Sequence, residues 1–186
     1  MSLRSLLLPN VLLHATAVPL LLIVLLLLLQ LVPILGLSPK LPRVNYFAYG
    51  SNLQPRILES RTLSRPGTLL PRPVILPNYK LCINLGTAAS VETSPHSKVP
   101  GLIYKLPLST FNILCLTEGY PIAYKLITVQ TLDSNNNLIS AYTFSSGRGL
   151  SDNKTTERYK NILVDGAKEN GLGDEWISYL ESLETL

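Results

Sequence analysis

The sequence predicts a mixed α+β domain built on an antiparallel sheet or a small barrel, preceded by an apolar segment. Three observations lead to this prediction: strand-like segments dominate the first part of the domain, amphipathic helices gather at its end, and no charged residue lies between Arg4 and Lys40. We expect a hydrophobic segment over 1–37, a linker over 38–43 and the folded domain over 44–186.

The segment before the domain has a length that suits a membrane. A helix needs roughly 20 apolar residues to cross a bilayer, and Val11 to Leu31 supplies such a run. A cleaved signal peptide is the alternative, but its cleavage site would be A-x-A-like, whereas the downstream end here reads VPILGLS. We therefore expect a retained single-pass anchor over residues 11–31. Because Lys40 and Arg43 follow the run, the domain is expected in the cytoplasm. Cys82 and Cys115 could form a disulfide, but two buried free thiols are expected in that compartment.

The first half of the domain alternates between strand patterns and turn signals. A β-rich segment predicts a first strand that ends near Tyr49. A short helix is expected around Leu53 to Ser60, with Pro55 in its first turn. Residues Lys80 to Leu85 and Gly101 to Leu106 then predict two strands that flank a polar loop.

The pattern changes to helical spacing from Ser109 onward. Gly119 supplies a stop signal, so Glu118 is expected at the end of a short helix. Two strand-like segments follow, at Ile122 to Val129 and at Leu138 to Phe144, and the polar residues between them predict a hairpin turn.

Two helices are expected at the C-terminal end. Apolar residues from Tyr159 to Ala167 recur at i, i+3, i+4, i+7 and i+8, which is typical of an amphipathic helix. The second helix is marked by Trp176, Leu180 and Leu183. Strands followed by segregated helices indicate an α+β domain.

Charge and composition exclude several classes of function. Basic residues outnumber acids between Lys40 and Lys80, where Glu59 is the one acid, which indicates an anionic ligand, an acidic membrane surface or simply a solvated face. The sequence contains no basic stripe interleaved with aromatic residues, so it does not predict nucleic-acid binding. With only His14 and His96, a metal cluster or a Ser-His-Asp triad has too few ligands or bases.

The stretch VNYFAYGSNL, from Val44 to Leu53, carries a strand directly into the turn Gly50-Ser51-Asn52. A helix that starts at Leu53 would take Asn52 as its N-cap. The exposed N–H groups of such a turn form an anion site for a carboxylate or a developing oxyanion. A plain helix cap is the alternative interpretation.

Glu118 is the candidate for proton transfer. It lies between an apolar helix and a chain reversal, where a carboxylate is suited to general acid/base work. The alternative is an exposed residue at a helix C-terminus, which the helix dipole makes mildly unfavourable. Because no phosphate-binding glycine pattern is present either, chemistry would depend on a carboxylate, backbone donors and hydroxyls.

Three motifs together resemble the γ-glutamylcyclotransferase family. They are YFAYGSNL at Tyr46 to Leu53, EG at Glu118-Gly119, and YKNILVDGAKENGL at Tyr159 to Leu172. They occur in the family's order and span nearly the whole domain. The resemblance implies a small mixed β-barrel with peripheral helices, and release of 5-oxoproline from a γ-glutamyl compound without a metal or an organic cofactor.

The resemblance also implies roles for individual residues. Glu118 would be the general acid/base. The substrate would be held by Tyr49, Gly50, Ser51, Asn52, Tyr124 and Tyr159. Family members that act on γ-glutamyl amines usually have Thr-Leu after the Tyr-Gly pair, so Ser51-Asn52 disfavours that subtype.

The expected substrate is a γ-glutamyl amino acid, a γ-glutamyl peptide or a glutathione conjugate. Family members are usually soluble, so the expected anchor is an addition to the pattern. Fungal relatives remove γ-glutamyl groups from glutathione adducts during secondary-metabolite biosynthesis, which gives one alternative role. A non-catalytic, membrane-tethered binding domain of the same fold is another.

Overall fold

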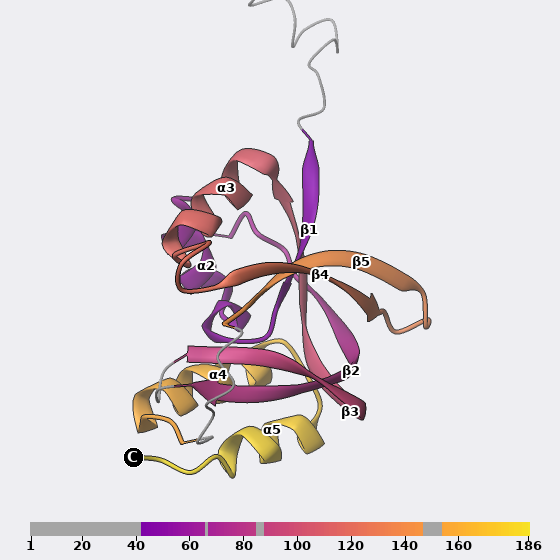
Figure 1. Ribbon diagram of the computed structural model, residues 1–186, viewed down its shortest axis with the longest axis vertical. Helices are drawn as coiled ribbons and strands as arrows, with labels where there is room; N and C mark the ends of the chain where they lie inside the picture. Colours follow the sequence, from indigo (N-terminus) through magenta and orange to yellow (C-terminus); the bar gives the residue numbers. More distant parts are fainter. Residues whose placement is uncertain (1–41, 66, 85–87, 147–153) are drawn as a thin grey trace, which may run out of the picture. The chain divides into compact units, whose positions relative to one another are not determined.

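The computed structural model describes residues 42–65, 67–84, 88–146 and 154–186 (Figure 1). The anchor expected over 11–31 therefore lies outside the described residues. Within the parts of the chain that the structure describes, no helix is long and apolar enough to cross a membrane.

The domain is built on one five-stranded sheet. Its strands are β1 (Arg43–Ala48), β2 (Arg72–Asn84), β3 (Ala88–Pro107), β4 (Lys125–Leu132) and β5 (Leu138–Ser145). Their hydrogen-bonded order, β1-β3-β2-β4-β5, closes on itself as a barrel. Two contacts complete this closure: the parallel pair Tyr46 and Tyr142 joins β1 to β5, and the antiparallel pair Ile75 and Leu132 joins β2 to β4. The sheet is therefore mixed.

The helices surround this sheet, which confirms the α+β class. They are the 3-10 turn η1 (Ser51–Leu53), α2 (Pro55–Thr62), α3 (Leu108–Thr117), α4 (Glu157–Glu169) and α5 (Asp174–Glu181). Helices α2 and α3 contact each other beside β1, whereas α4 and α5 pack together near the β2–β3 hairpin (Figure 1). The two helices predicted at the C-terminal end are both present.

The β2–β3 hairpin is longer than the sequence predicted. Strand β3 includes most of the segment that was expected as a polar loop, so that prediction is wrong. Pairs such as Leu76 with Val99 and Tyr79 with Thr93 keep the polar segment in register with β2. A bulge between Pro77 and Tyr79 accommodates the irregular pattern. Cross-strand pairing thus overrides the local loop signals.

An aromatic cluster fixes α3 against the sheet. The rings of Tyr46 and Phe144 have centroids 5.8 Å apart, and Phe111 of α3 lies 6.3 Å from Phe144. Leu114, on the next turn of α3, is fully buried. Because one face of α3 is held in this way, the residue that ends the helix has a defined position. Both cysteines are free thiols, as predicted, but only Cys82 is buried and Cys115 is half-buried.

Candidate active site

All seven residues expected at the site line one cavity of about 90 Å³. They are Tyr49, Gly50, Ser51, Asn52, Glu118, Tyr124 and Tyr159. Tyr46, Arg61, Ala89 and Phe144 complete the lining. A larger cavity of about 710 Å³, between the β2–β3 hairpin and α5, contains none of these residues. The candidate chemistry is therefore concentrated in the smaller, more polar space.

The turn after β1 is tighter than expected. The backbone N–H of Leu53 donates to the carbonyl of Gly50 at 2.9 Å, which forms the 3-10 turn η1. Helix α2 begins afterwards, with Pro55 in its first turn and Gln54 as its N-cap. The prediction that Asn52 caps the helix is therefore wrong. Its side chain makes contacts within the cavity instead.

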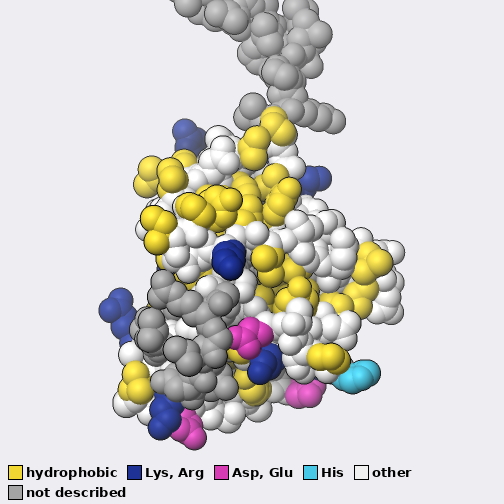
Figure 2. Space-filling model, viewed as in Figure 1, with side chains coloured by type: hydrophobic (Ala, Val, Ile, Leu, Met, Phe, Trp, Pro, Cys, Tyr) yellow, Lys and Arg dark blue, Asp and Glu magenta, His cyan; other side chains and the backbone are white. Residues whose placement is uncertain are grey.

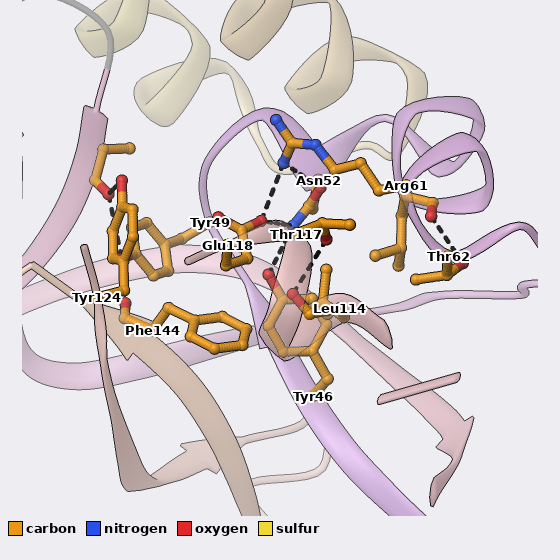
Figure 3. A network of polar contacts seen from close by, with 12 residues as sticks. Tyr46, Tyr49, Asn52, Arg61, Thr62, Leu114, Thr117, Glu118, Tyr124 and Phe144 are labelled. Atoms are coloured by element: carbon orange, nitrogen blue, oxygen red, sulfur yellow. Dashed lines mark hydrogen bonds and ion pairs between the residues drawn. The ribbon is translucent and has the colours of Figure 1, made fainter. Parts of the chain in front are cut away.

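Asn52 joins three side chains of the cavity (Figure 3). Its Nδ2 donates to Glu118 Oε1 at 2.9 Å and to the hydroxyl of Tyr46 at 2.8 Å. Its Oδ1 accepts from Arg61 Nη1 at 2.7 Å. Since Asn52 is buried and its side chain has partners on both sides, the amide is held in one orientation.

Glu118 lies at the C-cap of α3, as the sequence predicted. Its Oε1 also accepts from Arg61 Nη1 at 3.0 Å, which makes an ion pair. The side chain of Glu118 is 15% exposed and that of Arg61 is 36% exposed. Within the described residues, Oε2 of Glu118 has neither a hydrogen bond nor an ion pair. One carboxylate oxygen is thus anchored and the other is available to a ligand.

Two tyrosine hydroxyls converge on one backbone carbonyl beside this carboxylate. The single hydroxyl proton of Tyr49 lies within reach of the carbonyls of Phe144 and Ala89, and Tyr124 donates to the carbonyl of Ala89 at 3.2 Å. Burial raises the pKa of both phenols above its ordinary value. Both phenols therefore remain protonated near neutral pH.

Tyr159, at the start of α4, closes the cavity over Gly50. A Cβ added at Gly50 would lie 3.2 Å from the Tyr159 hydroxyl and 3.2 Å from the Cβ of Ala89. The absence of a side chain at Gly50 therefore lets α4 approach the turn closely. Burial raises the pKa of Tyr159, and backbone hydrogen bonding at Ala89 and Ser51 offsets part of that rise.

The rest of α4 packs against the same turn. A Cβ added at Gly166 would lie only 2.7 Å from the Cβ of Leu53, so the helix contacts η1 directly at this glycine. Asn170 Nδ2 donates to the carbonyl of Leu53 at 2.9 Å, and Gln54 Nε2 donates to the carbonyl of Ile162 at 3.0 Å. The late motif thus supports the Gly50 turn from outside the cavity.

Sequence and structure comparisons point to the same family. Residues 98–180 match the model of the AIG2-like family. The chain is 28% identical over 152 residues to a γ-glutamylcyclotransferase from Bos taurus and 29% identical over 150 residues to one from Homo sapiens. Each alignment covers 75% of this chain and 78% of the relative. A solved γ-glutamyl cyclotransferase structure, 27% identical, matches with a TM-score of 0.70 over 78% of this chain and 90% of its own.

These matches support a place for the chain in the γ-glutamylcyclotransferase family. The family-model match begins inside β3 and ends in α5, so it includes Glu118, Tyr124 and Tyr159. The longer alignments and the structural match extend the likeness over most of the domain.

The resemblance gave no site role to two residues of this cavity. Arg61 contributed only to the basic excess of its region, and Tyr46, although it opens the first motif, was assigned only to a strand. Once α2 is known to begin at Pro55, its helical register turns Arg61 toward the end of α3. That register, rather than any motif, is the signal that could have identified Arg61.

Proposed function

We propose that the domain is a γ-glutamylcyclotransferase that releases 5-oxoproline from a γ-glutamyl amino acid, a γ-glutamyl peptide or a glutathione conjugate. One observation carries the proposal. Glu118 is anchored through Oε1 by Asn52 and Arg61, while its Oε2 has no partner within the described residues. This carboxylate borders the same cavity as the Gly50 turn.

The proposed reaction is an intramolecular displacement. The α-amine of the γ-glutamyl group attacks its own γ-carbonyl carbon, a C–N bond closes the five-membered ring, and the original γ-amide C–N bond breaks. The enzyme chiefly has to fold the substrate into this geometry and move protons. Holding reacting groups in attack geometry supplies roughly 7 to 11 kcal/mol in favourable intramolecular cases.

Glu118 is the proposed general acid/base. It takes a proton from the α-ammonium group, which frees the lone pair for attack, and it returns a proton to the departing amine. Such a role is typically worth on the order of 100- to 10,000-fold in rate. The hydrogen bonds from Asn52 and Arg61 to Oε1 leave Oε2 for this transfer.

The negative charges of the substrate and the transition state need donors. Backbone N–H groups of the turn from Gly50 to Asn52 hold the α-carboxylate or the tetrahedral oxyanion. Arg61 is the second donor in this proposal. Its two described contacts both use Nη1, and its side chain is partly exposed, so the other guanidinium nitrogens can reach a carboxylate.

Because the cavity is small, the two ends of the substrate lie in different surroundings. A volume of about 90 Å³ corresponds to only a few water molecules, each of which occupies about 30 Å³ in the liquid. The reacting end of the substrate therefore lies inside, and the departing amine extends outside the cavity. Contacts that the departing amine makes outside the cavity then decide the preference among amino acid, peptide and conjugate.

The test is product formation from a panel of substrates. The full chain is incubated separately with γ-glutamyl dipeptides, glutathione, a glutathione conjugate and a γ-glutamyl amine, and 5-oxoproline is measured in each. We expect product from at least one of the first three and little from the amine. Binding without product would support the non-catalytic alternative, and selective turnover of the conjugate would support a role in secondary-metabolite biosynthesis.

A further inference from the structure

Helix α3 is uncharged on its exposed side as well as on its buried side, and its exposed residues include two leucines, Leu108 and Leu116, beside polar ones. No charged residue occurs from Leu108 to Thr117, and the charge of Glu118 is paired with Arg61 in the cavity. Leu116 is nevertheless 75% exposed. Exposed apolar side chains that gather in one patch mark interaction surfaces for proteins or membranes. In the described domain, α3 lies at the edge, so its exposed leucines have no cover.

A groove of about 430 Å³ runs beside this helix. Its apolar lining includes Val44, Leu108, Leu116, Tyr120, Leu126 and Tyr142. Ile122, in the turn that follows α3, is 89% exposed. We call these seven residues the α3 surface. Figure 2 shows hydrophobic side chains gathered over the part of the domain where Figure 1 draws α3 and the start of β1.

Basic side chains adjoin the α3 surface. Arg43 precedes Val44 on β1, Lys125 precedes Leu126 on β4, and Lys105 lies on β3 opposite Asn45; all three are exposed. Successive side chains of a strand point to opposite faces, so these cations flank the apolar residues and do not lie among them. None of them is in an ion pair within the described parts of the chain. An apolar surface with tyrosines and a cationic margin is the pattern of a protein face that sits in a lipid headgroup region.

The chain enters the domain beside this surface. The carbonyl of Pro42 accepts a hydrogen bond from the N–H of Leu108 at 2.9 Å, so the start of the described chain is tied to the start of α3. The segment expected to cross a membrane ends at Leu31. The chain between Leu31 and Pro42 spans at most about 40 Å when fully extended. A bilayer that held this segment would therefore be within reach of α3.

We propose that the α3 surface rests on a lipid bilayer that contains anionic headgroups. The apolar side chains enter the boundary between headgroups and acyl chains, and the basic margin contacts the headgroup charge. The lipid surface is favoured over cover by another protein segment because the basic residues carry no acidic partners. This interaction is separate from the proposed reaction, and its test needs no substrate.

The experiment uses tryptophan fluorescence of the full chain in vesicles. Trp176 is the single tryptophan, so Trp176→Phe gives a background into which Leu116→Trp is introduced. The vesicles contain phosphatidylcholine and phosphatidylserine, with or without doxyl-labelled phosphatidylcholine as a quencher. We expect the indole at position 116 to emit at shorter wavelength and to lose most of its emission to the quencher. If Leu116→Trp impairs folding, Ile122→Trp in the same background takes its place and should show the same emission shift and quenching.

The matched control is Leu138→Trp in the same background, because Leu138 is 69% exposed at the start of β5. Its emission, and that of Trp176 in the wild type, should change little. Equal quenching at 116 and 138, or no quenching at 116, would overturn the proposal. A shift to shorter wavelength at 116 without quenching would also overturn it, since a protein segment would then cover the surface.

Discussion

Asn52 and Glu118 lie 66 positions apart in the sequence, and the amide of Asn52 donates a 2.9 Å hydrogen bond to the carboxylate of Glu118. This bond joins the turn after β1 to the end of α3. The same amide contacts Tyr46 and Arg61, so a change in any of these groups is transmitted to the carboxylate. The carboxylate of Glu118 and the turn after β1 are therefore joined in one hydrogen-bonded network.

Glu118→Gln should greatly reduce 5-oxoproline release while leaving the fold intact. The amide oxygen of glutamine can still accept from Asn52 and Arg61, but the side chain can no longer take up a proton. We expect turnover to fall by about 100- to 10,000-fold, the usual contribution of a general acid/base. Product formation and circular dichroism are measured for this variant and for Glu92→Gln, which lies outside the cavity. Near-normal turnover by Glu118→Gln would sink the mechanism.

Arg61→Ala should lower kcat/KM by about 10- to 100-fold, because a hydrogen bond to a charged group is worth roughly 1.5 to 3 kcal/mol. Part of the effect should appear in KM, through lost binding of a substrate carboxylate, and part in kcat, through a less ordered Glu118. Stability should change little, since Arg61 is partly exposed.

The control for Arg61→Ala is Arg56→Ala on the same helix. Arg56 contacts Gln54 and does not line the cavity, so its loss removes the same charge without touching Glu118. Equal kinetic effects of the two substitutions would show that Arg61 acts only through the general charge of α2.

Local patterns in the sequence predicted the elements whose signals agree with one another. The stop at Gly119 fixed the end of α3, and the spacing from Tyr159 to Ala167 fixed the register of α4. The polar part of β3 was missed because its strand character comes from pairing with β2, which no local window contains. Strand propensity depends on cross-strand neighbours, so such segments are the hardest to predict.

The candidate site, like the fold, could be predicted from the sequence only in part. The family resemblance identified seven residues that the structure brings to one cavity, although no motif reveals the contact between Asn52 and Glu118. Asn52 was expected to cap a helix because asparagine is favoured there. The tertiary contact with Glu118 prevails because it pairs a buried amide with a charged acceptor. Arg61 was missed because an ion pair between two helices produces no regular residue spacing by which the sequence could reveal it.

Gly166→Ala should destabilise the domain and reduce turnover, even though alanine favours helices by about 1 kcal/mol over glycine. The new Cβ would meet Leu53 at 2.7 Å, and overpacking of this kind typically costs 1 to 3 kcal/mol. Displacement of η1 would also move Asn52 away from Glu118. Denaturant unfolding and turnover are measured beside Asp165→Ala, an exposed site on the same helix. A Gly166→Ala domain more stable than the wild type would contradict this packing role.

The stability of the domain should fall at alkaline pH because burial raises the pKa of several tyrosines. Among them are Tyr46, Tyr49, Tyr104, Tyr124 and Tyr159. Below about pH 10, the ordinary tyrosine pKa, both states are protonated and the stability is complete. Above it the unfolded chain releases protons that the folded domain retains, so each such tyrosine lowers the free energy of unfolding by up to about 1.4 kcal/mol per pH unit. The urea midpoint, measured from about pH 8 to about pH 11, should therefore decrease above about pH 10. Tyr104→Phe should start lower, because its hydroxyl donates to Asn52, but decline less steeply; an equal slope would contradict the assignment.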